Sequence, residues 1–94
     1  MTEILASSLI NALLKKGFER AETHHTMLWL MVQGRRTSIH TWLSHGQRKL
    51  DDRLLRLVAG ELHLSRAELL KFVECEMSRE DYHRRMVDRG HLRA

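Results

Sequence analysis

The sequence predicts an α+β fold in which a three-stranded antiparallel sheet packs against helices, in the order α-β-β-β-α-α. Apolar residues recur at three- and four-residue spacing near the start of the chain and again beyond residue 51. Shorter segments between them are either wholly apolar or alternate in polarity, as strands do. With 94 residues, 43% of them apolar, we expect residues 1–94 to form a single domain with a modest core.

The first helix is predicted over residues 3–16. Leu9 and Leu13 lie one helical turn apart on an apolar face. Thr2 can cap the start of this helix, and Gly17 can end it, because glycine readily adopts the left-handed conformation of a helix C-terminus.

Three strands are predicted to follow. Residues 18–24 have no helical period, and residues 27–32 form an apolar run typical of a central, covered strand. Gly34 indicates a hairpin turn, after which residues 38–43 alternate between apolar and polar. We expect Trp29 to lie in the core, whereas Trp42 can either pack there or stack on a nucleobase.

Capping residues indicate where the later helices begin. Asp51 or Asp52 can cap a helix that contains residues 54–62. The segment Ser65–Glu68 fits a capping box for a second helix. The segment Ser78–Asp81 resembles such a box less closely and starts a last helix.

The chain is basic, with 16 Lys and Arg against 12 Asp and Glu and a net charge of +4. Such a balance favours polyanions such as RNA, although the same charges can simply keep the protein soluble. The candidate phosphate contacts are Lys15, Lys16, Arg20, Arg35, Arg36, Arg48 and Lys49.

Other features argue against a membrane or secreted protein. The longest apolar run, residues 27–32, is far shorter than the roughly 20 residues that cross a bilayer. The first residues read as an amphipathic helix rather than a signal peptide. The single cysteine, Cys75, fits a cytoplasmic location and is expected to be packed rather than reactive.

Four short motifs, in this order and spacing, resemble the HicA family of toxins. They are Leu13–Phe18, Thr23–His25, Gly34–Thr37 and His45–Gly46, the last followed by the Leu-rich segment 54–62. The resemblance covers residues 1–65 and leaves residues 66–90 as additional C-terminal helices. It implies an mRNA interferase with a double-stranded-RNA-binding-domain-like fold, a catalytic histidine at His24 and an antitoxin-like protein partner.

The residues before His24 depart from the family pattern. The family's usual Gly-Ser-His is Glu22-Thr23-His24 in this chain. A carboxylate at residue 22 could repel the substrate phosphate, or it could hold His24 in a useful tautomer.

RNA cleavage without a metal requires one group that removes the 2′-hydroxyl proton and another that protonates the leaving oxygen. Histidine suits both tasks because its ordinary pKa lies near neutral pH. His45 is a candidate second acid or base, or else a residue that only makes turn hydrogen bonds. His25 is expected to face away from His24, because strand side chains alternate. The histidine spacing does not fit a zinc site, so we expect no metal and no cofactor.

Three classes of function remain open from the sequence. The first is a metal-independent endoribonuclease that acts as the toxin of a type II toxin–antitoxin pair. The second is a catalytically inactive module that binds RNA or a nucleoprotein. The third is a phage-type inhibitor that acts through protein–protein contacts of residues 66–90.

Overall fold

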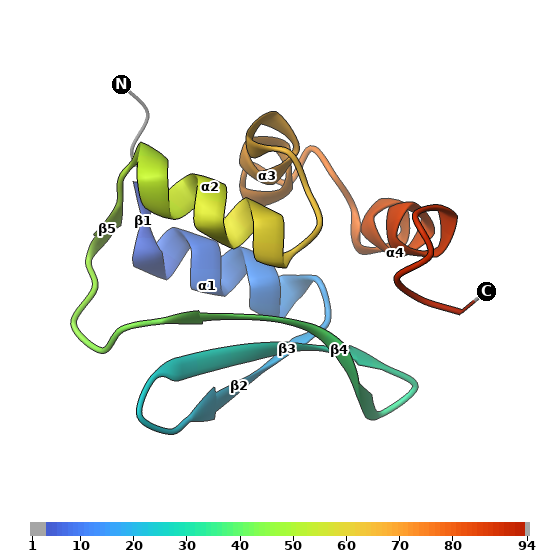
Figure 1. The fold of residues 1–94 in the computed structure, drawn as a ribbon, viewed down its shortest axis with the longest axis horizontal. Helices are drawn as coiled ribbons and strands as arrows, with labels where there is room; N and C mark the ends of the chain where they lie inside the picture. Colours follow the sequence, from blue (N-terminus) through green and yellow to red (C-terminus); the bar gives the residue numbers. More distant parts are fainter. Residues whose placement is uncertain (1–3, 94) are drawn as a thin grey trace.

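The helices lie on one side of a three-stranded antiparallel sheet in the computed structural model, which describes residues 4–93 (Figure 1). The elements are β1 (Ile4–Leu5), α1 (Ala6–Lys15), β2 (Phe18–Glu22), β3 (Thr26–Val32), β4 (Arg35–Leu43), β5 (Lys49–Leu50), α2 (Asp52–Glu61), α3 (Arg66–Val73) and α4 (Arg79–Asp88). This arrangement confirms the predicted α+β class.

Two details differ from the predicted order. Three helices follow the sheet, one after each of the caps predicted at Asp51, Ser65 and Ser78, so the order α-β-β-β-α-α is one helix short. The two-residue strands β1 and β5 pair with each other and were not predicted, since two residues carry no periodicity. The predicted cap Thr2 lies outside the described residues.

The sheet has the order β2-β3-β4, so the apolar strand β3 is central, as predicted. Gln33 and Gly34 form the β3–β4 turn, with φ angles of 54° and 76°. Two successive left-handed residues are the requirement of the tight hairpin turn that Gly34 indicated.

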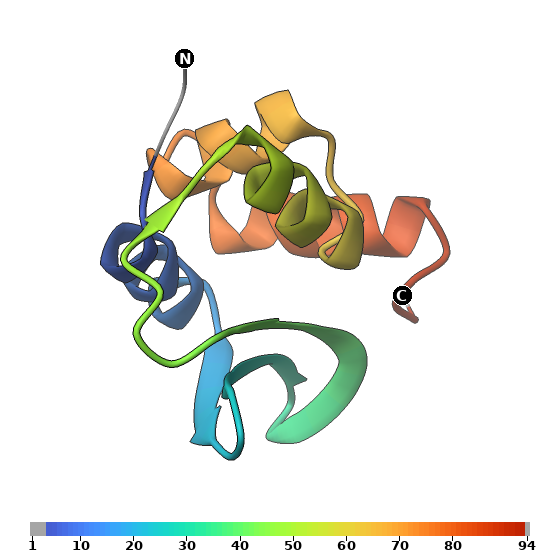
Figure 2. The same ribbon diagram turned by 60° about the vertical axis from the view of Figure 1, so that its left-hand side comes forward.

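The two faces of the sheet differ in what covers them. Side chains such as Leu28 and Ile39 point to the helices and are fully buried. By the strand register, the opposite face, called the outer face below, carries Met27, Trp29 and Trp42. Figure 2 shows no helix on this side of the sheet. The expectation that β3 is covered on both faces was therefore wrong.

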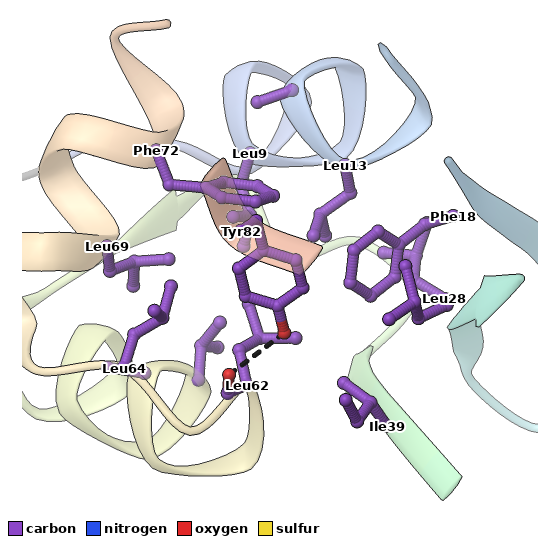
Figure 3. Packing of buried hydrophobic residues seen from close by; sticks show 14 of the residues in the cluster. Leu9, Leu13, Phe18, Leu28, Ile39, Leu62, Leu64, Leu69, Phe72 and Tyr82 are labelled. Carbon is purple, nitrogen blue, oxygen red and sulfur yellow. Dashed lines mark hydrogen bonds between the residues drawn. The ribbon is translucent and has the colours of Figure 1, made fainter. Parts of the chain in front are cut away.

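The core lies between the sheet and the helices (Figure 3). Leu9 and Leu13 enter it from α1, as the helical spacing predicts. Phe18, Phe72 and Tyr82 meet at its centre, with the Phe72 and Tyr82 ring centroids 5.2 Å apart. The Tyr82 hydroxyl donates a hydrogen bond of 2.9 Å to the Leu62 carbonyl, which joins α4 to the end of α2.

The predicted helix caps are present. The side chain of Asp51 accepts a hydrogen bond from the Leu54 amide at the start of α2. Ser65 and Glu68 form a complete capping box at the start of α3, and Ser78 and Asp81 form one at α4. Both boxes satisfy amides that the first helical turn would otherwise leave unpaired.

Candidate active site and nucleic-acid interface

Two segments that carry histidines leave the sheet at the same end. The loop Thr23–His25 joins β2 to β3, and the turn Ser44–Gln47 follows β4. The strand register places Glu22, Thr26 and Leu43 side by side across the sheet, so both segments start from adjacent strand ends. Figure 1 shows them together at the left.

Glu22 connects the two segments. Nε2 of His45 lies 3.1 Å from Oε2 of Glu22. The same carboxylate accepts hydrogen bonds from Nε of Arg20 at 2.6 Å and from the hydroxyl of Thr26 at 3.2 Å. These bonds, that of Arg20 above all, lower the pKa of Glu22 from its ordinary value, although partial burial opposes them. Glu22 is therefore ionised at neutral pH and can fix the His45 ring.

The two adjacent histidines lie in a loop and not at the end of a strand. The Thr23 amide donates a 2.9 Å hydrogen bond to the His25 carbonyl, which closes the loop. The expectation that strand alternation separates His24 from His25 was therefore wrong. The ring of His25 lies on that of Trp42, with centroids 4.3 Å apart, whereas His24 is exposed.

This end of the sheet can bring two imidazoles to one substrate. His24 is two residues from the carboxylate that contacts His45, and both histidines are exposed. Neutral imidazole accepts a proton and imidazolium donates one, so such a pair can serve as base and acid in one reaction. Glu22 contacts one of these two imidazoles, that of His45, and can orient its ring.

The predicted phosphate contacts are distributed over several surfaces. Lys15, Arg35, Arg48 and Lys49 are exposed. The Arg20 guanidinium forms an ion pair with the Glu22 carboxylate. Arg36 lies over the Trp29 ring, with 5.2 Å between its guanidinium carbon and the ring centroid.

Lys16 has a different environment from its neighbour Lys15. It is only 5% exposed, and its amine lies 4.9 Å from the centroid of the Phe72 ring. The amine also contacts Sγ of Cys75 at 3.8 Å. A phosphate cannot reach Lys16 without displacing these contacts, so we omit it from the RNA-binding surface. Cys75 itself is exposed, which corrects the expectation of a packed thiol.

The hairpin arginines lie at the opposite end of the sheet from the histidines. Arg35 pairs with Val32 at one end of β3, and Leu43 pairs with Thr26 at the other. Six residue steps along a strand correspond to roughly 20 Å. Arg48 and Lys49, which follow His45 closely in sequence, are the predicted cations on the histidine side.

A basic cleft of about 540 Å³ lies at the hairpin end. Its cationic and titratable lining residues are Arg35, Arg36, His83, His91 and Arg93, and no carboxylate lines it. The chain returns to this place because the amides of His91 and Leu92 both donate to the Met86 carbonyl at the end of α4. The sequence did not reveal this cleft, because its lining comes from segments about 50 residues apart.

The outer face carries aromatic contacts that the sequence analysis missed. Trp29 was assigned to the core, yet it is only half-buried and stacks on His40, with ring centroids 4.3 Å apart. Trp42 is 41% exposed, so core packing is not its role. The alternation of residues 38–43 already placed His40 and Trp42 on one face, but it did not show that this face was open.

Residues 4–93 hold neither a group of metal ligands nor a helix that could span a membrane. No three His, Cys, Asp or Glu side chains in this part of the chain are grouped as a metal site would require. No helix there has the length and apolar character needed to cross a membrane. Comparisons with protein-family models, curated protein sequences and solved structures found no match for the chain.

Proposed function

We propose that this protein is a metal-independent endoribonuclease in which His24 and His45 supply the acid and base. The observation that carries the proposal is the 3.1 Å contact between His45 and Glu22, which ties the turn after β4 to the loop that bears His24. Two exposed histidines on adjacent loops, one of them held by a carboxylate, match the requirements of 2′-hydroxyl activation and leaving-group protonation.

The proposed roles follow from the hydrogen bond to Glu22. When Nε2 of neutral His45 donates to the carboxylate, Nδ1 retains its lone pair and can remove the 2′-hydroxyl proton. The 2′-oxygen then attacks phosphorus, and the bond to the 5′-oxygen breaks. His24, as imidazolium, gives its proton to that oxygen. Arg48 and Lys49 are the nearest predicted cations in sequence to stabilise the charge on phosphate.

The biological role that we propose rests on the resemblance of Thr23–His25 and the other three motifs to the HicA family. Under this proposal the protein is the toxin of a toxin–antitoxin pair, and an antitoxin-like protein neutralises it. The element order α1-β2-β3-β4-α2 supports a double-stranded-RNA-binding-domain-like fold for residues 1–65. In that case α3 and α4 are additions to the core.

The proposal is tested by RNA cleavage in excess chelator. We expect the wild-type protein to cleave RNA, and His24→Ala and His45→Ala each to lose at least a hundred-fold in rate. A matched control is His63→Asn, because His63 lies far from this site in sequence and has a left-handed φ of 59° that asparagine tolerates. Circular dichroism confirms that each variant is folded.

The outcomes separate the open classes of function. Cleavage that is equal in all four proteins would overturn the assignment of His24 and His45. A wild-type protein that binds RNA and leaves it intact would favour the second candidate, an RNA-binding module. That candidate is supported by the negative charge of Glu22 beside the histidines, which opposes the approach of a phosphate.

A further inference from the structure

The outer face of the sheet presents a row of ring systems to solvent. Two ring pairs make up this row: Trp29 and His40 are stacked, and Trp42 and His25 are tilted by 32°. In each pair the ring centroids are 4.3 Å apart. Figure 2 shows no helix on this side of the sheet. At its edge, Trp42 also lines a pocket with Leu54 and Leu57 of α2, but it remains 41% exposed.

The spacing of the pairs is set by β4. His40 and Trp42 are two residues apart on one strand, so their side chains point to the same face at a separation of roughly 7 Å. That separation is close to the reach of one nucleotide in an extended single strand. Two neighbouring bases can therefore each meet one ring pair.

A cation completes the row. The Arg36 guanidinium lies over the Trp29 ring at 5.2 Å from its centroid, on the side toward the hairpin. Glu19, on the adjacent strand β2, contacts Arg36 at 3.4 Å and supplies the negative charge of this face. Both partners of that ion pair are about half exposed, so Arg36 can exchange it for a phosphate.

We propose that the outer face binds single-stranded RNA by stacking bases on the Trp42–His25 and Trp29–His40 pairs. The inference rests on the proposed function and deepens it, because it names unpaired RNA as the substrate class. Aromatic rings on an open sheet bind unpaired bases through their faces, which every base possesses. In a duplex those faces are already stacked on neighbouring bases, so duplex RNA cannot use the row.

Charge favours RNA over an apolar protein partner at this face. Arg36 belongs both to the aromatic row and to the basic cleft, so the two surfaces are continuous. The cleft adds Arg35 and Arg93 without any carboxylate in its lining. A strand whose bases stack on the row can thus extend its phosphates into the cleft. At its other end, His25 precedes β3 beside His24, which places that end of the row next to the proposed active site.

Intrinsic fluorescence tests the proposal directly, since Trp29 and Trp42 are the only tryptophans in the chain. The ligand is a short 2′-O-methyl RNA, which lacks the nucleophile and stays intact. We expect the single strand to quench the emission on stacking. We expect the blunt duplex of the same sequence to leave the emission unchanged.

Variants assign the effect to the row. Trp42→Leu is expected to weaken binding about ten-fold or more, measured by anisotropy of a labelled strand, while Trp42→Phe retains most of the affinity. His40→Ala provides a second test that leaves both tryptophans in place. The control is Leu14→Ser, which removes an exposed apolar side chain from α1 and is expected to change the affinity less than two-fold.

Quenching tests the stacking surface and cleavage tests the proposed function, so the two proposals can fail independently. Quenching of the wild-type protein by the 2′-O-methyl strand, with no cleavage of the matching RNA, would sustain this inference and remove the proposed function. Cleavage of RNA by the wild-type protein, with no change of its emission on adding the single strand, would sustain the proposed function and overturn this inference. Equal quenching by the duplex, or unchanged affinity in Trp42→Leu and His40→Ala, would overturn the stacking surface.

Discussion

Glu22 has the most varied surroundings of any side chain near the proposed active site. It accepts hydrogen bonds from Arg20 and Thr26 and contacts His45, and these neighbours lower its pKa. Sequence analysis left two effects open for Glu22, repulsion of a phosphate or support of a histidine. The geometry pairs it with His45 rather than with His24, the histidine that the second alternative concerned.

Replacing Glu22 separates these two effects. We expect Glu22→Gln to lower kcat about ten-fold, because the ring of His45 loses its charged partner. We expect KM to fall as well, because one negative charge near the substrate phosphate is removed. Steady-state cleavage of a short RNA gives both constants. An unchanged kcat would show that Glu22 does not position His45.

The burial of Lys16 and the exposure of Trp29 could not be predicted from the sequence. Lys15 and Lys16 look equivalent in a basic pair, but the second turns inward at the end of α1 and lies over Phe72. Trp29 sits in an apolar run, which suggests burial on both sides. Which face of a strand remains uncovered depends on where distant helices pack, and no local pattern contains that information.

At the scale of elements, the local signals were reliable. The capping boxes at Ser65 and Ser78 and the turn at Gly34 were all predicted from the sequence, because each depends on two to four adjacent residues. The histidine loop was placed inside a strand instead. Its residues, Thr23–His25, carry no glycine or proline to mark a turn.

Helix α4 is attached to the core mainly through Tyr82. The hydroxyl group is buried and donates to the Leu62 carbonyl, and burial raises its pKa. We expect Tyr82→Phe to lower the free energy of unfolding by about 1–2 kcal/mol, because a buried carbonyl loses its partner. Urea unfolding measures this loss. A change within error would mean that water replaces the hydroxyl.

A second attachment of α4, the ion pair between Arg89 and Glu68 of α3, depends on pH. Hydrogen bonds from Arg89, the capping bond at Ser65 and the charge of Arg85 together lower the pKa of Glu68 from 4.5 to about 2. An unfolded chain binds this proton near pH 4.5 and the folded protein only near pH 2, so the stabilisation is complete above pH 4.5 and is lost as the pH falls toward 2.

The matched variant is Glu68→Gln. At pH 7 we expect it to be about 1–2 kcal/mol less stable than the wild-type protein, a value reduced from the full linkage figure because the charges are partly exposed to solvent. The difference should shrink as the pH falls below 4.5. Urea unfolding at several pH values measures it, and a difference that stays constant from pH 7 to pH 3 would contradict the ion-pair account.

At the scale of the whole molecule, the surfaces on which the proposals rest lie on different parts of the sheet. Helices occupy one face of the sheet (Figure 1). The aromatic row lies on the other face, and the histidines and the basic cleft lie at opposite ends. The fold class and strand order could be predicted from periodicity. The cleft could not, because residues such as Arg35 and Arg93 meet only after the chain has folded.

The cleft predicts how RNA affinity depends on salt. Each phosphate contact in a single strand contributes about 0.7 to the slope of log K against log salt concentration. We therefore expect Arg35→Ala and Arg93→Ala each to reduce the slope by about that amount. The control Arg53→Ala, an exposed arginine on α2, should leave the slope unchanged. Equal slopes in all of these proteins would remove the cleft from the RNA-binding surface.

The central claim is that two histidines cleave RNA through its 2′-hydroxyl group. The most direct measurement is the cleavage, in excess chelator, of one RNA and of the same RNA with a single 2′-deoxy nucleotide at the mapped cleavage site. We predict a 2′,3′-cyclic phosphate and a 5′-hydroxyl on the products, and no cleavage at the deoxy position. An intact ribose substrate, or cleavage of the deoxy substrate to leave a 5′-phosphate, would contradict the account.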